Sequence, residues 1–137
     1  METTQETKPN VFFDSDGGNW VLKVDWAAMR RALSVGVDLS IIEEHVADFL
    51  RGHPKLIDAI WAVAKSTKKD LTVEEVESVV SGQVIEPATH ALCEAVAMFY
   101  PEKRAASIRA AEKAVKQEID KAIDTVLSKQ STNSQDA

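Results

Sequence analysis

The chain changes its hydrophobic period at a single residue near its start. In "WVLKVDWAAMRRAL" (residues 20–33), Trp20, Leu22 and Val24 recur at every second position, whereas apolar residues from Trp26 onward recur at helical spacing. Asp25 stands at the change, and its short carboxylate can accept hydrogen bonds from the free N–H groups of the next turn, as a helix N-cap does. The pattern predicts a strand that leads directly into a helix.

A second short β-prone run, "VFFD" at residues 11–14, precedes this strand and is separated from it by "SDGGN". Glycines in this linker allow the positive φ angles of a tight turn, so we expect a β-hairpin over residues 11–24. An isolated hairpin is only marginally stable in water. We therefore expect its apolar face, with Phe13 and Trp20 as candidates, to pack on helices, and Trp20 and Trp26 to anchor it.

Helical patterns fill the rest of the chain. They predict helices from Asp25 to about Ser34, from Ser40 to Gly52, from Lys55 to Lys65, from Thr72 to Gly82, from Pro87 to Pro101 and from Glu102 to about Lys129. Two of them begin with a capping box, in which a Ser or Thr and a Glu three residues later satisfy backbone N–H groups: Ser40 with Glu43, and Thr72 with Glu75. The predicted core comprises Trp26, Leu33, Phe49, Ile60, Trp61, Val76, Leu92, Val96 and Phe99.

These patterns predict a mainly α fold: a small bundle of five to six helices with a short N-terminal β-hairpin and a long C-terminal helix. The last helix, residues 102–129, lacks Gly and Pro and would be about 42 Å long at 1.5 Å per residue. Its apolar stripe runs to the far end, beyond what a body of about 90 residues can cover. The residues that we expect to bind a helical partner are Phe99, Tyr100, Ile108, Val115, Ile119, Ile123 and Val126.

Length and composition predict one domain. We expect residues 11–101 to form its body, and residues 1–10 and 130–137, which are polar and aperiodic, to be disordered. A single cysteine, Cys93, excludes an intrachain disulfide. The polar start has no signal-peptide pattern, and no apolar run approaches the length of a membrane span. The default expectation is a cytoplasmic protein with no membrane partner.

The net charge of −6 is unevenly distributed. Residues 1–101 hold 9 basic and 16 acidic side chains and carry −7, whereas residues 102–137 hold 7 and 6 and carry +1. Because affinity for nucleic acids comes largely from neutralising phosphates with Lys and Arg, a body of this charge is a poor binder of DNA or RNA. We expect no nucleic-acid partner.

The sequence offers little chemistry. It contains no HExxH, GxSxG or P-loop pattern. His90 and Cys93 lie three residues apart near Glu94, a spacing that suits metal ligands, but no third and fourth ligands converge in the sequence. The acidic residues at 74–77 are those that a helix dipole favours in a first turn. We therefore expect no enzymatic activity, no cofactor and no metal.

Four stretches follow one another in the order "WVLKVDWAAMRRALSVGVDLS", "IDAIWAVAK", "LTVEEVESVV" and "AVAMFYP". This order, over about residues 11–101, resembles the tail assembly chaperones of long-tailed bacteriophages and the related gene-transfer-agent proteins. The resemblance implies a small non-enzymatic helical protein of the host cytoplasm. Such a protein binds the helical tape measure protein and keeps it soluble while tail tube subunits polymerise around it. The long helix after Pro101 has no counterpart in that pattern.

A second interpretation remains open. A small helical regulatory or adaptor protein that dimerises through residues 105–127 would show the same apolar stripe, so the stripe also permits a homo-oligomer. Both interpretations describe a protein that binds another helix rather than an enzyme.

Overall fold

The computed structural model describes residues 9–136, and the side chains of residues 9–128. The fold is mainly helical, with a two-stranded antiparallel hairpin at the N-terminal end and a long C-terminal helix, as predicted. The predicted disorder of residues 1–8 and 137 lies outside the described part, whereas residues 130–136, also predicted to be disordered, continue the C-terminal helix. Asn10, which we expected to be disordered, is 6% exposed and donates from Nδ2 to the Leu22 carbonyl oxygen at 2.7 Å.

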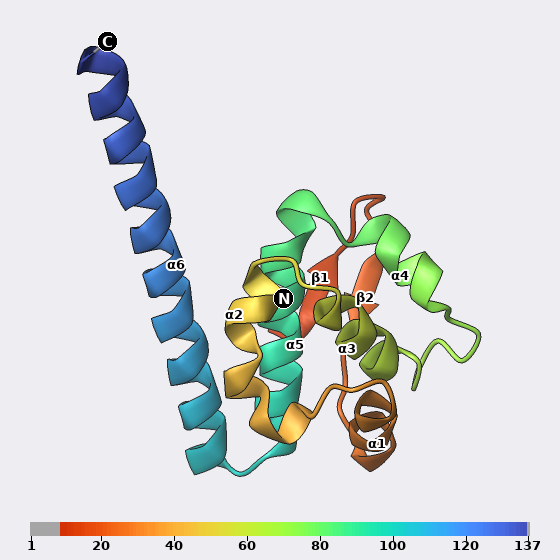
Figure 1. The fold of residues 1–137 in the computed structure, drawn as a ribbon. Coiled ribbons are helices and arrows are strands. Elements are labelled where there is room, and N and C mark those ends of the chain that lie inside the picture. Colours follow the sequence, from red (N-terminus) through yellow and green to blue (C-terminus); the bar gives the residue numbers. More distant parts are fainter. Residues whose placement is uncertain (1–8, 137) are drawn as a thin grey trace, which may run out of the picture.

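The elements follow one another with short connections. The helices are α1 (Trp26–Ser34), the 3-10 helix η2 (Leu39–Glu44), α2 (Val46–Leu50), α3 (Lys55–Ala64), α4 (Val73–Val79), the 3-10 helix η3 (Gly82–Val84), α5 (Ile85–Phe99) and α6 (Glu102–Asp136). Figure 1 shows α5 in the centre of the body, with the hairpin, α2 and α3 around it. Helix α6 lies along one side of the body and continues beyond it as an unbroken helix.

The hairpin pairs β1 (Val11–Phe13) with β2 (Asn19–Val21), and Phe12 lies opposite Trp20. The rings of Phe12 and Trp20 stack at 5.7 Å and are both buried. Phe13 was predicted on this inner face and is 55% exposed instead. The prediction was wrong because cross-strand partners share a face, and the register places Phe12 beside Trp20.

The helix begins where the sequence predicts it, but the strand does not lead directly into it: β2 ends at Val21, and residues 22–25 connect it to α1 without regular structure. Asp25 is the N-cap of α1, and its carboxylate accepts a hydrogen bond from the Ala28 N–H at 2.8 Å. The buried face of α1 is formed by Ala28, Met29 and Ala32. Trp26 and Leu33, two predicted core residues, are 66% and 56% exposed. Helix α1 packs on α3. Its buried face is centred on Ala28 and Ala32, which leaves the two larger side chains outside that face.

The two predicted capping boxes differ in outcome. Thr72 and Glu75 form theirs as predicted, with each side chain accepting from the backbone N–H of the other. The box of Ser40 and Glu43 is absent, because Asp38 accepts from the Ser40 N–H at 3.0 Å and begins a 3-10 helix two residues earlier. The nearby carboxylate of Asp38 has displaced the hydroxyl of Ser40 as the cap.

The core lies where α5 meets the other helices and the hairpin. Every residue from 91 to 97 of α5 is buried. The predicted core residues that are buried are Phe49, Ile60, Val76, Leu92 and Val96. Trp61 and Phe99 are half-buried, and the Trp61 Nε1–H donates to the Leu71 carbonyl oxygen at 2.9 Å. The body of the fold is therefore assembled around α5.

Candidate functional site

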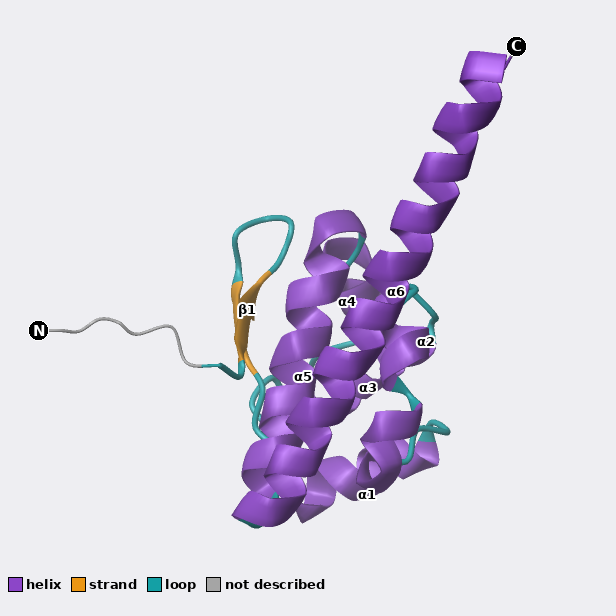
Figure 2. Ribbon diagram, turned by 90° about the vertical axis from the view of Figure 1, so that its left-hand side faces the viewer, coloured by secondary structure: helices purple, strands orange, loops and turns teal. Residues whose placement is uncertain are grey.

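Helix α6 has one half on the body and one half beyond it. Its first half packs against α5 and α2, where Ile108 is fully buried and Val115 is half-buried. Ile119 is the last half-buried residue, and every residue from 120 to 128 is exposed. Figures 1 and 2 show the C-terminal part of the helix standing clear of the body. We call residues 117–136 the overhang.

The apolar face of α6 continues along the overhang. Ile123, Val126 and Leu127 are 51%, 54% and 57% exposed, among the most exposed large apolar side chains of the described residues. Ala122 joins these three side chains in lining a shallow groove of about 300 Å³. We define the distal stripe as Ile119, Ala122, Ile123, Val126 and Leu127. Uncovered apolar surface of this kind is typical of a binding surface.

The seven residues predicted to bind a partner do not lie on one surface. Ile108 is fully buried and therefore unavailable to a partner. Phe99 and Tyr100 lie at the opposite end of α6, next to its first residue, and their rings pack edge to face at 5.1 Å. Only the outer members of the set, Ile123 and Val126 with Ile119 at the margin, lie together on the overhang.

The N-terminal end of α6 is tied to η2. Arg104 pairs with Glu43 and also donates to the Ser40 carbonyl oxygen at 2.5 Å. Its guanidinium lies 5.3 Å from the centre of the Tyr100 ring. Glu43, predicted to cap a helix, therefore holds α6 instead. Its partner is 61 positions away in the sequence, which is why local pattern analysis missed it.

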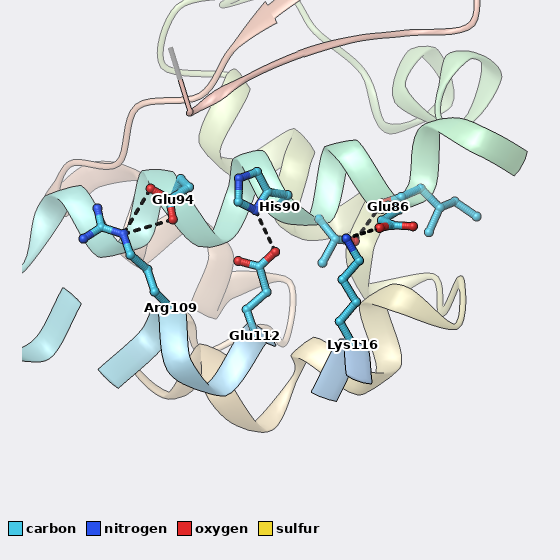
Figure 3. Close-up of polar contacts among 8 residues, drawn as sticks. Glu86, His90, Glu94, Arg109, Glu112 and Lys116 are labelled. Carbon is cyan, nitrogen blue, oxygen red and sulfur yellow. Dashed lines mark hydrogen bonds and ion pairs between the residues drawn. The ribbon is translucent and has the colours of Figure 1, made fainter. Parts of the chain in front are cut away.

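Six charged or titratable side chains join α5 to α6 above this point, and we call them the charge ladder (Figure 3). Lys116 pairs with Glu86. The His90 Nδ1 lies 2.8 Å from a Glu112 carboxylate oxygen, and the Arg109 Nε donates to Glu94 at 3.0 and 3.2 Å. Glu86 and Glu94 flank His90 on α5, and Glu112 faces His90 from α6. Sliding α6 by one turn would therefore place Glu112 opposite another carboxylate. The ladder therefore favours one register.

The two central carboxylates of the charge ladder are shielded from solvent. Glu94 and Glu112 are only 6% and 8% exposed. Burial raises the pKa of Glu112, which the hydrogen bond from His90 partly offsets and the nearby charge of Glu94 reinforces. Their partners lie toward the solvent, since the side chains of His90 and Arg109 are 54% and 42% exposed.

The sequence points to part of this cluster. His90 and Glu94 are in it, but Cys93 points into the core, where burial raises the pKa of its thiol. Glu112 takes the third place from the facing helix and was missed. A signal was present in the sequence, because the three pairs are nearly symmetric about Pro101, the turn between two antiparallel helices.

Comparison of the chain with protein-family models, with curated proteins and with solved structures finds no match. Within the described residues, no helix combines the length and the apolar character that crossing a bilayer requires.

Proposed function

We propose that this protein is a non-enzymatic assembly chaperone that binds an amphipathic helix of its partner along the distal stripe. The observation that carries the proposal is the continuation of one apolar face from a covered to an uncovered half of the same helix. The resemblance to tail assembly chaperones supports a tape measure protein as the partner, since such a protein is itself a long helix with apolar seams.

The spacing of the stripe supports a helix as its cover. The face of α6 follows two interleaved series with a period of seven: Ala105, Glu112, Ile119 and Val126, and Ile108, Val115 and Ala122. A period of seven is the coiled-coil repeat, in which side chains of one helix insert between those of another. The early members pack on α5 and α2. A partner helix placed beyond them would extend the same packing along the overhang.

Charge favours a different chain over a second copy. Residues 117–128 hold three acidic side chains, Glu118, Asp120 and Asp124, against Lys121, a net charge of −2. Two such segments repel each other, whereas a helix with basic residues beside its apolar seam is attracted. We therefore propose a partner helix that carries Lys or Arg along its seam. Dimerisation through the distal stripe is the alternative that the same experiment detects.

The strength of the contact can be bounded. Ile123, Val126 and Leu127 are each about half exposed, so covering them contributes about 1 kcal/mol apiece. That total is well below the roughly 8 kcal/mol of a micromolar complex. The contact with the partner must therefore extend beyond these three side chains, as it would along a long helix.

Coexpression with a candidate tape measure protein tests the proposal. We expect the two chains to co-elute in size-exclusion chromatography and the partner to stay soluble. The variant with Ile123→Asp and Val126→Asp should lose both effects. A matched control, Gln117→Asp with Thr125→Asp, adds the same charge at exposed positions away from the stripe and should keep them. Equal binding by both variants would refute the distal stripe as the interface.

The alternative predicts a different result. If the chain dimerises through the overhang, light scattering on the purified protein alone should give twice the monomer mass. The Ile123→Asp and Val126→Asp variant should then be monomeric. A monomeric wild-type chain excludes the alternative.

A further inference from the structure

The centre of the charge ladder brings three potential metal ligands together. His90 and Glu94 lie one turn apart on α5, and Glu112 faces them from α6 (Figure 3). One ligand atom from each residue lies within 4.8 Å of the other two. We expected no metal from the sequence, because its candidate ligands are neighbours on a single helix. The third ligand comes from a helix that is distant in the sequence.

Charge at this point is incompletely balanced. Two buried carboxylates, Glu94 and Glu112, face one guanidinium and one imidazole, so the cluster carries −1 whenever His90 is neutral. Burying carboxylate charge is costly unless it is paired. Both existing partners reach in from the solvent side, where their contacts are screened. A dication between the two carboxylates would compensate them more fully.

We propose that His90, Glu94 and Glu112 bind a divalent transition-metal ion of the zinc class. Imidazole with carboxylates suits such ions, whereas Mg²⁺ and Ca²⁺ prefer sites made of oxygen alone. Zinc lies about 2.0–2.2 Å from nitrogen and oxygen ligands. The three groups must therefore close in slightly from their present spacing, which rotation of the two flexible glutamates allows.

Two neighbouring side chains define the rest of the site. The Arg109 guanidinium is hydrogen-bonded to the Glu94 carboxylate in the present structure. Because 42% of the Arg109 side chain is exposed, it can turn into the solvent when the ion binds. His90 is 54% exposed, so the fourth coordination position faces water. The ion would join the two helices at the covered half of α6. The site lies away from the distal stripe, so the inference does not rest on the proposed function.

Isothermal titration of Zn²⁺ into the full chain, with any affinity tag removed and after treatment with a chelator, tests the proposal. We expect stoichiometric binding at neutral pH and a higher thermal midpoint with Zn²⁺ present. His90→Ala and Glu112→Gln should each weaken binding by more than the roughly 10–100-fold that loss of an outer-shell partner costs. Binding should also release protons and weaken as the pH falls.

Two control variants make the test specific. Lys116→Ala removes a neighbouring rung of the ladder without touching a proposed ligand, and Cys93→Ser removes the buried thiol. Cys93→Ser should bind Zn²⁺ like the wild type, and Lys116→Ala, which removes a cation whose charge acts on Glu112, should bind it at least as tightly. Circular dichroism shows whether each variant is folded. If His90→Ala does not fold, Glu112→Gln still tests the site, because glutamine has nearly the same shape as glutamate. Absence of binding to the folded wild type, or unchanged binding by both ligand variants, would overturn the site.

Discussion

The two halves of α6 have the same pattern of apolar residues and opposite surroundings. In the covered half, Ile108 is fully buried, and Arg104 and Arg109 are paired with η2 and α5. In the overhang, Ile123 and Val126 are about half exposed. One helix thus serves as a core element and as a free surface. The difference shows that the apolar stripe by itself does not say which residues a partner can reach.

The largest expected effect separates these halves directly. Ile108→Ala should lower the free energy of unfolding by about 2–5 kcal/mol, because it leaves a cavity in a packed core. Ile123→Ala should change it by less than about 0.5 kcal/mol, as at other exposed positions. Urea denaturation of both variants measures the contrast. Equal losses would mean that the overhang is part of the core.

Two tryptophans of the body allow the same comparison between a more buried and a more exposed apolar side chain. Trp61 is half-buried and hydrogen-bonded to Leu71, so Trp61→Ala should cost about 2–4 kcal/mol. Trp26 is 66% exposed and contacts Phe99 edge to face, so Trp26→Ala should cost only about 0.5–1.5 kcal/mol. Thermal unfolding followed by circular dichroism ranks the two. A larger loss of stability from Trp26→Ala than from Trp61→Ala would mean that Trp26 belongs to the core, as the sequence predicted.

A smaller effect is expected from the Arg109–Glu94 pair of the charge ladder, whose carboxylate is buried. Arg109→Ala leaves the buried carboxylate of Glu94 without its cation, and we expect a loss of about 1–2 kcal/mol after allowing for solvent screening. The double variant with Glu94→Gln should recover part of this loss. Chemical denaturation at low salt tests it, and an unchanged midpoint for Arg109→Ala would argue that the ladder does not hold α6.

The smallest effect on stability is expected from the exposed Lys116–Glu86 pair. The side chains of Lys116 and Glu86 are 49% and 55% exposed, and exposed ion pairs contribute little. Lys116→Ala should therefore change stability by only a few tenths of a kcal/mol. Comparison with Arg109→Ala under identical conditions shows whether burial determines how much each ion pair contributes to the free energy of unfolding. Equal losses from the two variants would contradict that view.

Local patterns predicted local structure well. The cap of α1 by Asp25 and the capping box of Thr72 depend on atoms within three residues of each other, and both are confirmed. The helical stripe of α5 was also predicted, because a central helix is apolar over most of its surface. These features need no knowledge of the neighbours of each element.

Failures occurred where distant neighbours decide the outcome. Trp26 and Leu33 were placed in the core because large apolar residues usually are, but the face that α1 buries is centred on Ala28 and Ala32. Ile108 was assigned to a partner because the sequence does not show how far α5 covers α6. Glu112 was missed because its role depends on the antiparallel pairing of two helices.

Backbone hydrogen exchange along α6, measured with and without the partner, tests the central claim most directly. In the free protein, we expect fast exchange at residues 119–128 and slow exchange at residues 105–115, since only the second segment is packed. Binding should slow the first segment strongly and leave the second unchanged. Protection on another face of the body, with residues 119–128 still exchanging fast, would contradict the distal stripe as the site where the partner binds.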